Sequence, residues 1–190
     1  MAMGNQNVLR SGYFPGIEIQ RGKILDKPVS RIIAGGNLIG GWAHARDLLY
    51  VGQLFKAYNT DVKVFETLAL AEKAGINTVN VLHTQLELIN KYKRIYESKL
   101  QTIVQVHPHK EDVFGDADRA MDLGGDFIQI QGNAVDFRVR DGEIDILAKC
   151  IDRIKSRGFP GGLGAHSVQA LQACEEAGIE PDFYLKTFHQ

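Results

Sequence analysis

The stretch Ile103-Val104-Gln105-Val106-His107-Pro108-His109 decides how the rest of the chain is interpreted. Alternation places Ile103, Gln105 and His107 on one face and two β-branched valines on the other, which is typical of a buried strand. Pro108 has no backbone N–H and cannot continue a strand ladder, so we predict that the strand ends there. Two histidines therefore lie at the exit of a buried strand, and we expect other strands to end in the same way.

The composition indicates a soluble globular chain and excludes several classes of partner. The 190 residues include 44% hydrophobic and 24% charged residues, enough for one well-buried core. With a formal net charge of −1 and scattered basic residues, we expect neither nucleic acid nor a membrane as a partner. No apolar run approaches the roughly 20 residues that span a bilayer, and no export signal is visible, so we expect a cytoplasmic protein. Cys150 and Cys174 fall in helical patterns and are expected to be buried, reduced thiols.

Strands alternate with helices along most of the sequence. Residues 1–16 show no periodicity and are predicted to be a flexible N-terminal arm, while residues 17–190 form a single domain. A hairpin is expected over residues 17–25, with its turn at Arg21-Gly22. Six strands are predicted, over residues 29–34, 76–82, 100–106, 126–131, 161–165 and 182–188. Five helices are expected between them, over about 60–74, 84–98, 112–123, 144–158 and 168–177, the second starting with a Thr84–Glu87 capping box.

This order predicts a parallel sheet with right-handed crossovers. The sheet is either open and doubly wound or part of a (β/α)8 TIM barrel. The barrel is favoured because its interior opens into a pocket at the C-terminal ends of the strands and would accept polar strand residues. The polar candidates are Thr78, Asn80, Gln105, Gln129, Gln131 and Lys186. A complete barrel needs about 250 residues, so we expect an incomplete barrel of about six βα units. Its open edges would favour a homo-oligomer.

Every histidine follows a predicted strand, at the end of the barrel where catalytic groups usually lie. These residues are His44, His83, His107, His109, His166 and His189. Imidazole transfers protons near neutral pH and is the commonest metal ligand. A divalent metal is therefore a candidate cofactor, with ligands drawn from His83, His107, His109, His166 and His189.

Other polar stretches allow two interpretations each. Gly35-Gly36-Asn37 lacks the Gly-Lys-Ser/Thr that completes a phosphate loop, so turn geometry explains it better. The charged residues between Asp136 and Asp141 could clamp a substrate or simply be solvated. Lys186 is expected to point into the barrel on one face with Tyr184 and Phe188, where burial is costly unless it serves as a base, a Schiff-base amine or a substrate clamp.

The segment from Lys23 to Asn37 (KILDKPVSRIIAGGN) resembles the opening of the aldo-keto reductase superfamily, and Ala71 to Asn77 (AEKAGIN) continues the likeness. The resemblance implies a TIM barrel and NADP(H)-dependent reduction of carbonyls. The family's catalytic Asp, Tyr, Lys and His fall on Asn80, Gln85, Gln105 and Gln131. An amide cannot replace the proton-donating tyrosine, so the residues present do not support NADP(H) chemistry.

We therefore predict an enzyme that acts on a sugar-like or hydroxycarbonyl small molecule by acid–base chemistry, of isomerase, epimerase or lyase type. The predicted catalytic residues are His107, His109 and Lys186. Amides donate and accept hydrogen bonds and Trp42 could stack on a sugar, so the predicted substrate-binding residues are Asn37, Trp42, His44, Asn80, Gln85, Gln105, Gln129, Gln131 and His166. The alternatives are a metal-dependent hydrolase or isomerase that uses the histidines, an NADP(H)-dependent oxidoreductase, and a non-enzymatic binding module.

Overall fold

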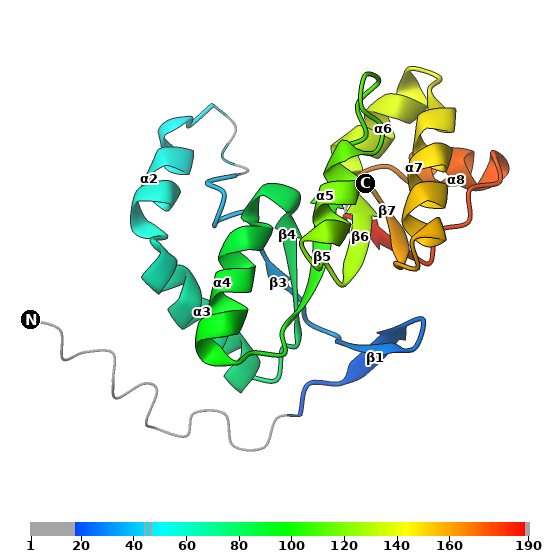
Figure 1. Ribbon diagram of the computed structural model, residues 1–190. Coiled ribbons are helices and arrows are strands. Elements are labelled where there is room, and N and C mark those ends of the chain that lie inside the picture. The colour runs from blue at the N-terminus through cyan, green and yellow to red at the C-terminus, as the bar shows by residue number, and fades with distance from the viewer. Residues whose placement is uncertain (1–17, 44, 46, 189–190) are drawn as a thin grey trace, which may run out of the picture.

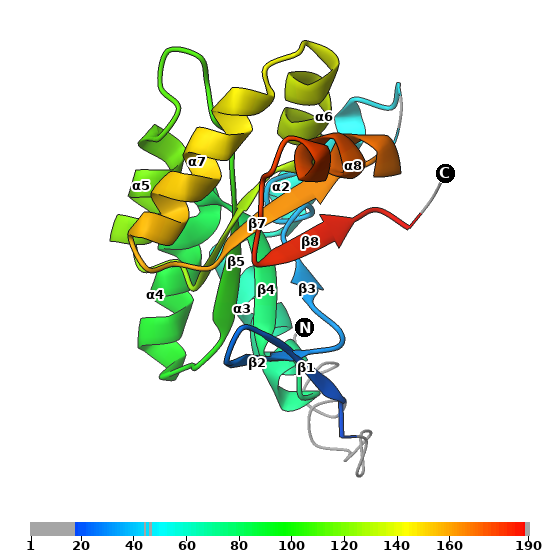
Figure 2. The same cartoon turned by 90° about the vertical axis from the view of Figure 1, so that its right-hand side faces the viewer.

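A computed structural model describes residues 18–43, 45 and 47–188 of the chain. Its centre is a parallel sheet of six strands in the order β3-β4-β5-β6-β7-β8. The strands are β3 (Ala34–Gly35), β4 (Thr78–Leu82), β5 (Gln101–Val106), β6 (Phe127–Ile130), β7 (Gly161–Ala165) and β8 (Phe183–Lys186). Each new strand is added beside the previous one, so the sheet curls as part of a TIM barrel, with helices along its outer side (Figures 1 and 2). The predicted fold class is confirmed.

The helices alternate with these strands. They are α2 (Tyr50–Tyr58), α3 (Asp61–Lys73), α4 (Leu86–Tyr96), α5 (Gly115–Asp122), α6 (Gly132–Arg140), α7 (Ile144–Ser156) and α8 (Val168–Glu176), with a 3-10 turn η1 (His83–Gln85) before α4. None of the described helices is long and apolar enough to cross a bilayer. The two cysteines are free and buried, as predicted, and burial raises the pKa of the Cys150 thiol to about 12.

The alternation of the strands divides their side chains between two apolar clusters and the interior. Val104 and Val106 face outward into the main core with the inner faces of α5 and α7. Val79 and Val81 face outward against α3 and α4. The opposite strand positions face the concave interior, so the predicted assignment of Ile103, Gln105 and His107 to one face is confirmed.

A hairpin closes the end of the sheet at which the strands begin (Figure 2). It consists of β1 (Arg21–Ile24) and β2 (Lys27–Ser30), paired antiparallel. Val29 of the hairpin packs with Ile103 and Phe127, and Ile24 and Phe183 pack against these three. We call these five residues the floor cluster. They fill the lower interior and leave the C-terminal ends of the strands open for a site.

Several predicted boundaries are wrong. The hairpin turn lies at Leu25-Asp26, where Leu25 has a positive φ of 52°, and not at Arg21-Gly22. The predicted first strand is divided, because Val29 belongs to the hairpin and only Ala34–Gly35 pairs with β4. Helices α2 and α6 are not among the five predicted helices. The predicted arm over residues 1–16 lies outside the described residues.

Candidate functional site

Two cavities that share lining residues lie at the C-terminal ends of the strands. The first, of about 370 Å³, is lined by Asn37, Trp42, Ala43, Leu82, Gln105, His107, Gln131 and Asn133. The second, of about 680 Å³, is lined by Asn37, Gln105, Gln129, Gln131, Gly132, Asn133, Gly164, Ala165, His166, Leu185 and Thr187. Nearly every strand contributes its last residue or the residue just after it, because parallel strands end at the same edge.

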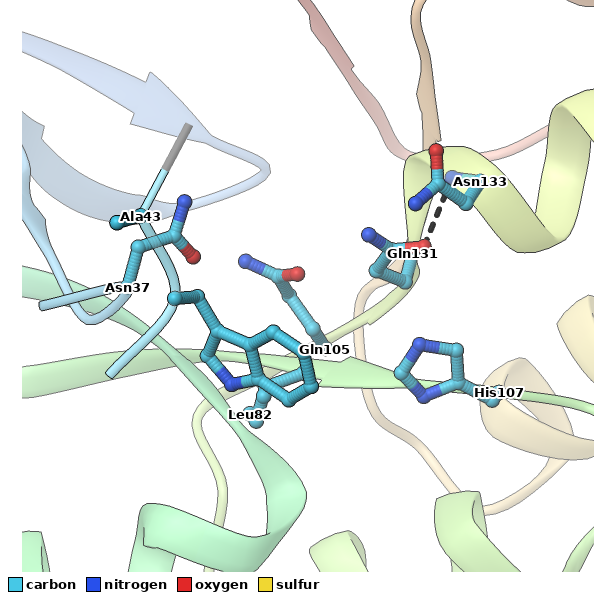
Figure 3. Close-up of a pocket in the computed structure, with 8 residues that line it drawn as sticks. Asn37, Ala43, Leu82, Gln105, His107, Gln131 and Asn133 are labelled. Atoms are coloured by element: carbon cyan, nitrogen blue, oxygen red, sulfur yellow. Dashed lines mark hydrogen bonds between the residues drawn. The ribbon is translucent and has the colours of Figure 1, made fainter. Parts of the chain in front are cut away.

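Amide side chains form the wall common to both cavities (Figure 3). Asn37 lies on one side, Gln131 and Asn133 lie on the other, and Gln105 lies between them. The Gln105 Nε2 donates to Asn80 Oδ1 at 2.7 Å, so Asn80 of the neighbouring strand β4 orients the Gln105 amide. Amides both donate and accept hydrogen bonds, and this wall can therefore bind hydroxyl and carbonyl groups.

Gln131 also starts helix α6. Its Oε1 accepts hydrogen bonds from the backbone N–H groups of Asn133 at 2.7 Å and Ala134 at 3.3 Å, which satisfies two of the unpaired donors at the helix N-terminus. The Nε2 is the part of this amide that remains for a ligand, and Figure 3 shows it on the side toward Gln105 and Asn37.

A histidine–carboxylate pair lies beside the second cavity. His166 follows β7, and its Nδ1 is 2.7 Å from the Oδ2 of Asp136, a residue of α6. The same carboxylate accepts the backbone N–H of His166 at 3.0 Å. Because an ionised carboxylate only accepts hydrogen bonds, Nδ1 carries the proton and Nε2 is the basic nitrogen of the ring. Gly132 permits this packing, since a Cβ there would lie 2.9 Å from Cε1 of His166.

A second group of ionisable side chains lies beside the first cavity. His83 follows β4, His107 follows β5, and Asp116 is in the first turn of α5. The Oδ2 of Asp116 lies 3.4 Å from Nδ1 of His83 and 3.9 Å from Nδ1 of His107, and it accepts the backbone N–H of His107 at 3.1 Å. Burial, the largest influence, lowers the pKa of His107 and outweighs the opposite effect of Asp116. We call these three residues the His83 trio.

The structure places the predicted residues differently in several cases. The prediction that Lys186 points into the interior is wrong. Leu185 and Thr187 line the second cavity, whereas Tyr184, on the same face of β8 as Lys186, donates a hydrogen bond to Glu175 of the outer helix α8. Lys186 itself donates to the carbonyl of Thr187. Its orientation follows from Phe183, which packs on Phe127 and so fixes which face of β8 is interior.

Gln85 and His109 are also not in the cavities. The Gln85 side chain is buried and structural: its Oε1 accepts the backbone N–H of Leu82 and its Nε2 donates to the carbonyl of Gly36. This contact replaces the predicted Thr84–Glu87 capping box at the start of the helix. His109 is exposed, and its ring lies roughly parallel to that of His107 with the centroids 6.5 Å apart. The predicted residues His44 and His189 lie outside the described residues.

The predicted pool of metal ligands is divided by the structure. Among the described residues, one group of histidine, cysteine and carboxylate side chains has the spacing to hold a metal ion, and it consists of the His83 trio. His166 pairs with Asp136 instead, and His109 is exposed and not part of this group. Sequence reasoning missed Asp116 and treated Asp136 only as one of several charged residues, because their positions depend on where helices α5 and α6 begin.

No protein family model and no curated protein matches the chain. Among solved structures, a putative deoxyribose-phosphate aldolase from Coccidioides immitis is 16% identical, with a TM-score of 0.51 over 69% of this chain and 56% of that one. A phospho-2-dehydro-3-deoxyheptonate aldolase from Thermotoga maritima is 13% identical, with a TM-score of 0.47 over 91% of this chain and 48% of that one. The chain thus spans about half the length of these structures. The likeness to the first shows a shared TIM-barrel fold, and membership of the aldo-keto reductase superfamily stays a prediction.

Proposed function

We propose that the protein is an enzyme that moves protons on a small, hydroxyl-rich carbonyl compound, in a reaction of the isomerase or lyase type. The observation that carries the proposal is the pairing of His166 with Asp136 beside a cavity whose shared wall is built from amides. A histidine held by a carboxylate is suited to act as a general base and then as a general acid. The amide wall supplies donors for an oxyanion.

The proposed chemistry starts at Nε2 of His166. In isomerisation, Nε2 takes a proton from the hydroxyl-bearing carbon beside the carbonyl, the electron pair of that C–H bond forms a C=C bond, and the carbonyl π electrons move to the carbonyl oxygen. The resulting enediolate accepts hydrogen bonds from amide N–H groups such as those of Gln131 and Asn133. The imidazolium then returns a proton to the former carbonyl carbon, while the proton of the neighbouring hydroxyl passes to the former carbonyl oxygen and leaves the new carbonyl behind. In aldol cleavage, Nε2 takes the proton of the β-hydroxyl, whose oxygen becomes the carbonyl of the released aldehyde, and the electrons of the breaking C–C bond form the enediolate. The imidazolium then protonates the enediolate at carbon to give the second carbonyl product. Asp136 holds the ring and stabilises its protonated form.

A Schiff-base route has less support. No lysine among the described residues lines either cavity, and Lys186 lies on the outer face of β8. The Coccidioides structure is described as a putative aldolase, and an aldolase reaction falls within the proposed class. At 16% identity, however, the likeness shows only a shared fold. The proposal rests on the side chains of this chain. It keeps His166 and the amides as site residues, as the sequence predicted, but assigns proton transfer to His166 and not to His107 or His109.

The test is solvent deuterium incorporation followed by NMR, because a base that removes a C–H proton exchanges it even without net turnover. Trioses, pentoses and hexoses, each as aldose and ketose, would be incubated with the protein in D₂O. We expect incorporation beside the carbonyl of at least one compound, reduced by about 10²–10⁴ in His166→Gln. Asp136→Asn should lower the rate as well, whereas Asp145→Asn, an exposed residue of α7, should not. Absence of exchange with every compound, or an unchanged rate in His166→Gln, would overturn the proposal.

A further inference from the structure

We infer that the His83 trio binds one divalent transition-metal ion at the edge of the first cavity. The three side chains come from separate elements, at the ends of β4 and β5 and the start of α5. They offer two imidazole nitrogens and one carboxylate oxygen that all lie within 4.8 Å of one another. Two histidines and one carboxylate form a ligand set typical of Zn²⁺, Mn²⁺ and Fe²⁺ sites that keep positions open for substrate.

The separations are close to those of a formed site. Ligands about 2.0–2.1 Å from a tetrahedral ion lie about 3.3 Å from one another. Nδ1 of His83 and Oδ2 of Asp116 are already 3.4 Å apart, and Nδ1 of His107 lies 3.9 Å from the same oxygen. The backbone N–H of His107 holds that oxygen between the two rings. Small rotations of the imidazoles would therefore complete three bonds.

A buried nitrogen that lacks a hydrogen-bond partner among the described residues points to a ligand. Nδ1 of His83 is buried and makes no hydrogen bond with any residue the structure describes, because its approach to Asp116 lacks hydrogen-bond geometry. Leaving a buried polar atom unsatisfied costs about 1–3 kcal/mol, so such atoms in folded proteins usually have a function or an additional partner. A metal ion would use the lone pair of this nitrogen and would also neutralise the half-buried carboxylate of Asp116.

The position of the trio gives the ion a role in the proposed function. His107 lines the first cavity together with Gln105 and Asn37, so open coordination positions would face a bound substrate. An ion there would polarise a carbonyl or stabilise an enediolate oxygen, while His166 transfers protons at the second cavity. This role rests on the proposed function, whereas binding of the ion itself can be measured without a substrate.

The experiment is calorimetric titration of the tag-free, chelator-treated chain with Zn²⁺, followed by visible absorption of the Co²⁺ form, which reports coordination geometry. We expect one ion per chain and absorption of a low-coordinate Co²⁺ site. His83→Ala and the nearly isosteric Asp116→Asn should each weaken binding by at least about 100-fold, more than is usual for residues that only support ligands. Thermal unfolding of the metal-free variants would verify that they fold.

Matched substitutions separate the trio from nonspecific binding. His109→Ala removes a neighbouring histidine outside the trio, and Asp122→Asn changes an exposed carboxylate on the same helix as Asp116. Both should retain one ion with an affinity within about threefold of the original. Absence of stoichiometric binding, or equal loss in His109→Ala and His83→Ala, would overturn the inference. Deuterium exchange that persists with a chelator would leave the proposed function intact.

Discussion

At the scale of single residues, Gln129 has a buried acceptor that no described residue satisfies. Gln129 is 1% exposed, its Oε1 has no hydrogen-bond partner in the described part of the chain, and its Nε2 is 3.4 Å from the carbonyl of Ile130. Gly164 makes space for this amide, since a Cβ there would lie 2.4 Å from Nε2. Because Gln129 lines the second cavity, we predict that a hydroxyl group of a bound molecule donates to Oε1.

We predict that Gln129→Met leaves the free energy of unfolding unchanged or raises it by up to about 1 kcal/mol, because it removes an unsatisfied buried acceptor at similar volume. Binding of a hydroxyl-bearing ligand should weaken by about 3- to 10-fold. Urea denaturation and ligand titration would measure the two effects. Thr102→Val is the control, because its buried hydroxyl is hydrogen-bonded to Asp126 and its loss should cost about 1–3 kcal/mol. Equal destabilisation in both variants would show that the Gln129 amide is structural.

The sequence predicts the positions of side chains at the strand ends, because strand alternation fixes them. It does not predict which helix residues become their partners. His83, His107 and His166 lie where predicted because parallel strands end together. Asp136 and Asp116 complete their sites, but their side-chain directions depend on the rotation of α6 and α5. No periodicity in the sequence fixes that rotation relative to the strand ends.

At the scale of secondary-structure elements, the errors have local causes. Helix α6 is absent from the predicted helices because Gln131, which caps it, is not among the residues that usually start helices. Lys186 was assigned to the wrong face because alternation gives the period of a strand but not its phase. The packing of Phe183 on Phe127 sets that phase, and this contact joins residues far apart in sequence.

Helices α5 and α7 are joined by an ion cluster whose contribution should depend on pH. Arg153 donates to both carboxylate oxygens of Asp118 at 2.9 and 3.0 Å, and Arg157 donates to Asp118 at 3.2 Å. Hydrogen bonds from Arg153, and then from Arg157, lower the pKa of Asp118. A carboxyl whose pKa is lower in the folded state stabilises the fold above its unfolded pKa of about 3.9, and this contribution is lost as the pH falls through the folded value.

We therefore predict that Asp118→Asn lowers the urea midpoint at pH 7 and that the difference from the unsubstituted chain shrinks progressively as the pH falls below about 4. Urea denaturation across this pH range would measure the change. Asp152→Asn, an exposed position of α7 outside the cluster, provides the comparison and should have little effect at either pH. A difference for Asp118→Asn that is undiminished at pH 2–3 would contradict the explanation by ionisation.

At the scale of the whole molecule, the site depends on a division of the concave interior into two levels. The floor cluster fills the end where the strands begin, and the amides, histidines and cavities occupy the opposite end. The barrel class was predictable because polar residues such as Gln105 and Gln129 occur on otherwise apolar strands. The role of the hairpin was not, because contacts of Val29 with Ile103 and Phe127 depend on tertiary packing.

The last prediction concerns this floor. Phe127 is fully buried, its ring centroid lies 6.1 Å from that of Phe183, and Lys27 of the hairpin lies over the ring at 5.2 Å. Phe127→Ala should therefore lower the free energy of unfolding by about 3–5 kcal/mol. It should also detach the hairpin, because Val29 loses a large aromatic side chain on which it packs. Urea denaturation would measure the first effect, and hydrogen exchange over residues 21–30 would measure the second.

Phe188→Ala makes the same chemical change at a fully exposed position and should alter stability by no more than about 0.5 kcal/mol. If Phe127→Ala destabilises the fold while exchange in the hairpin stays slow, the hairpin is held by its own contacts, such as the hydrogen bonds of Ser30 with Asn77. If exchange in the hairpin rises more than exchange in β7, the floor cluster connects the hairpin to the sheet. The lower end of the cavities is then closed by a segment that the sheet itself holds in place.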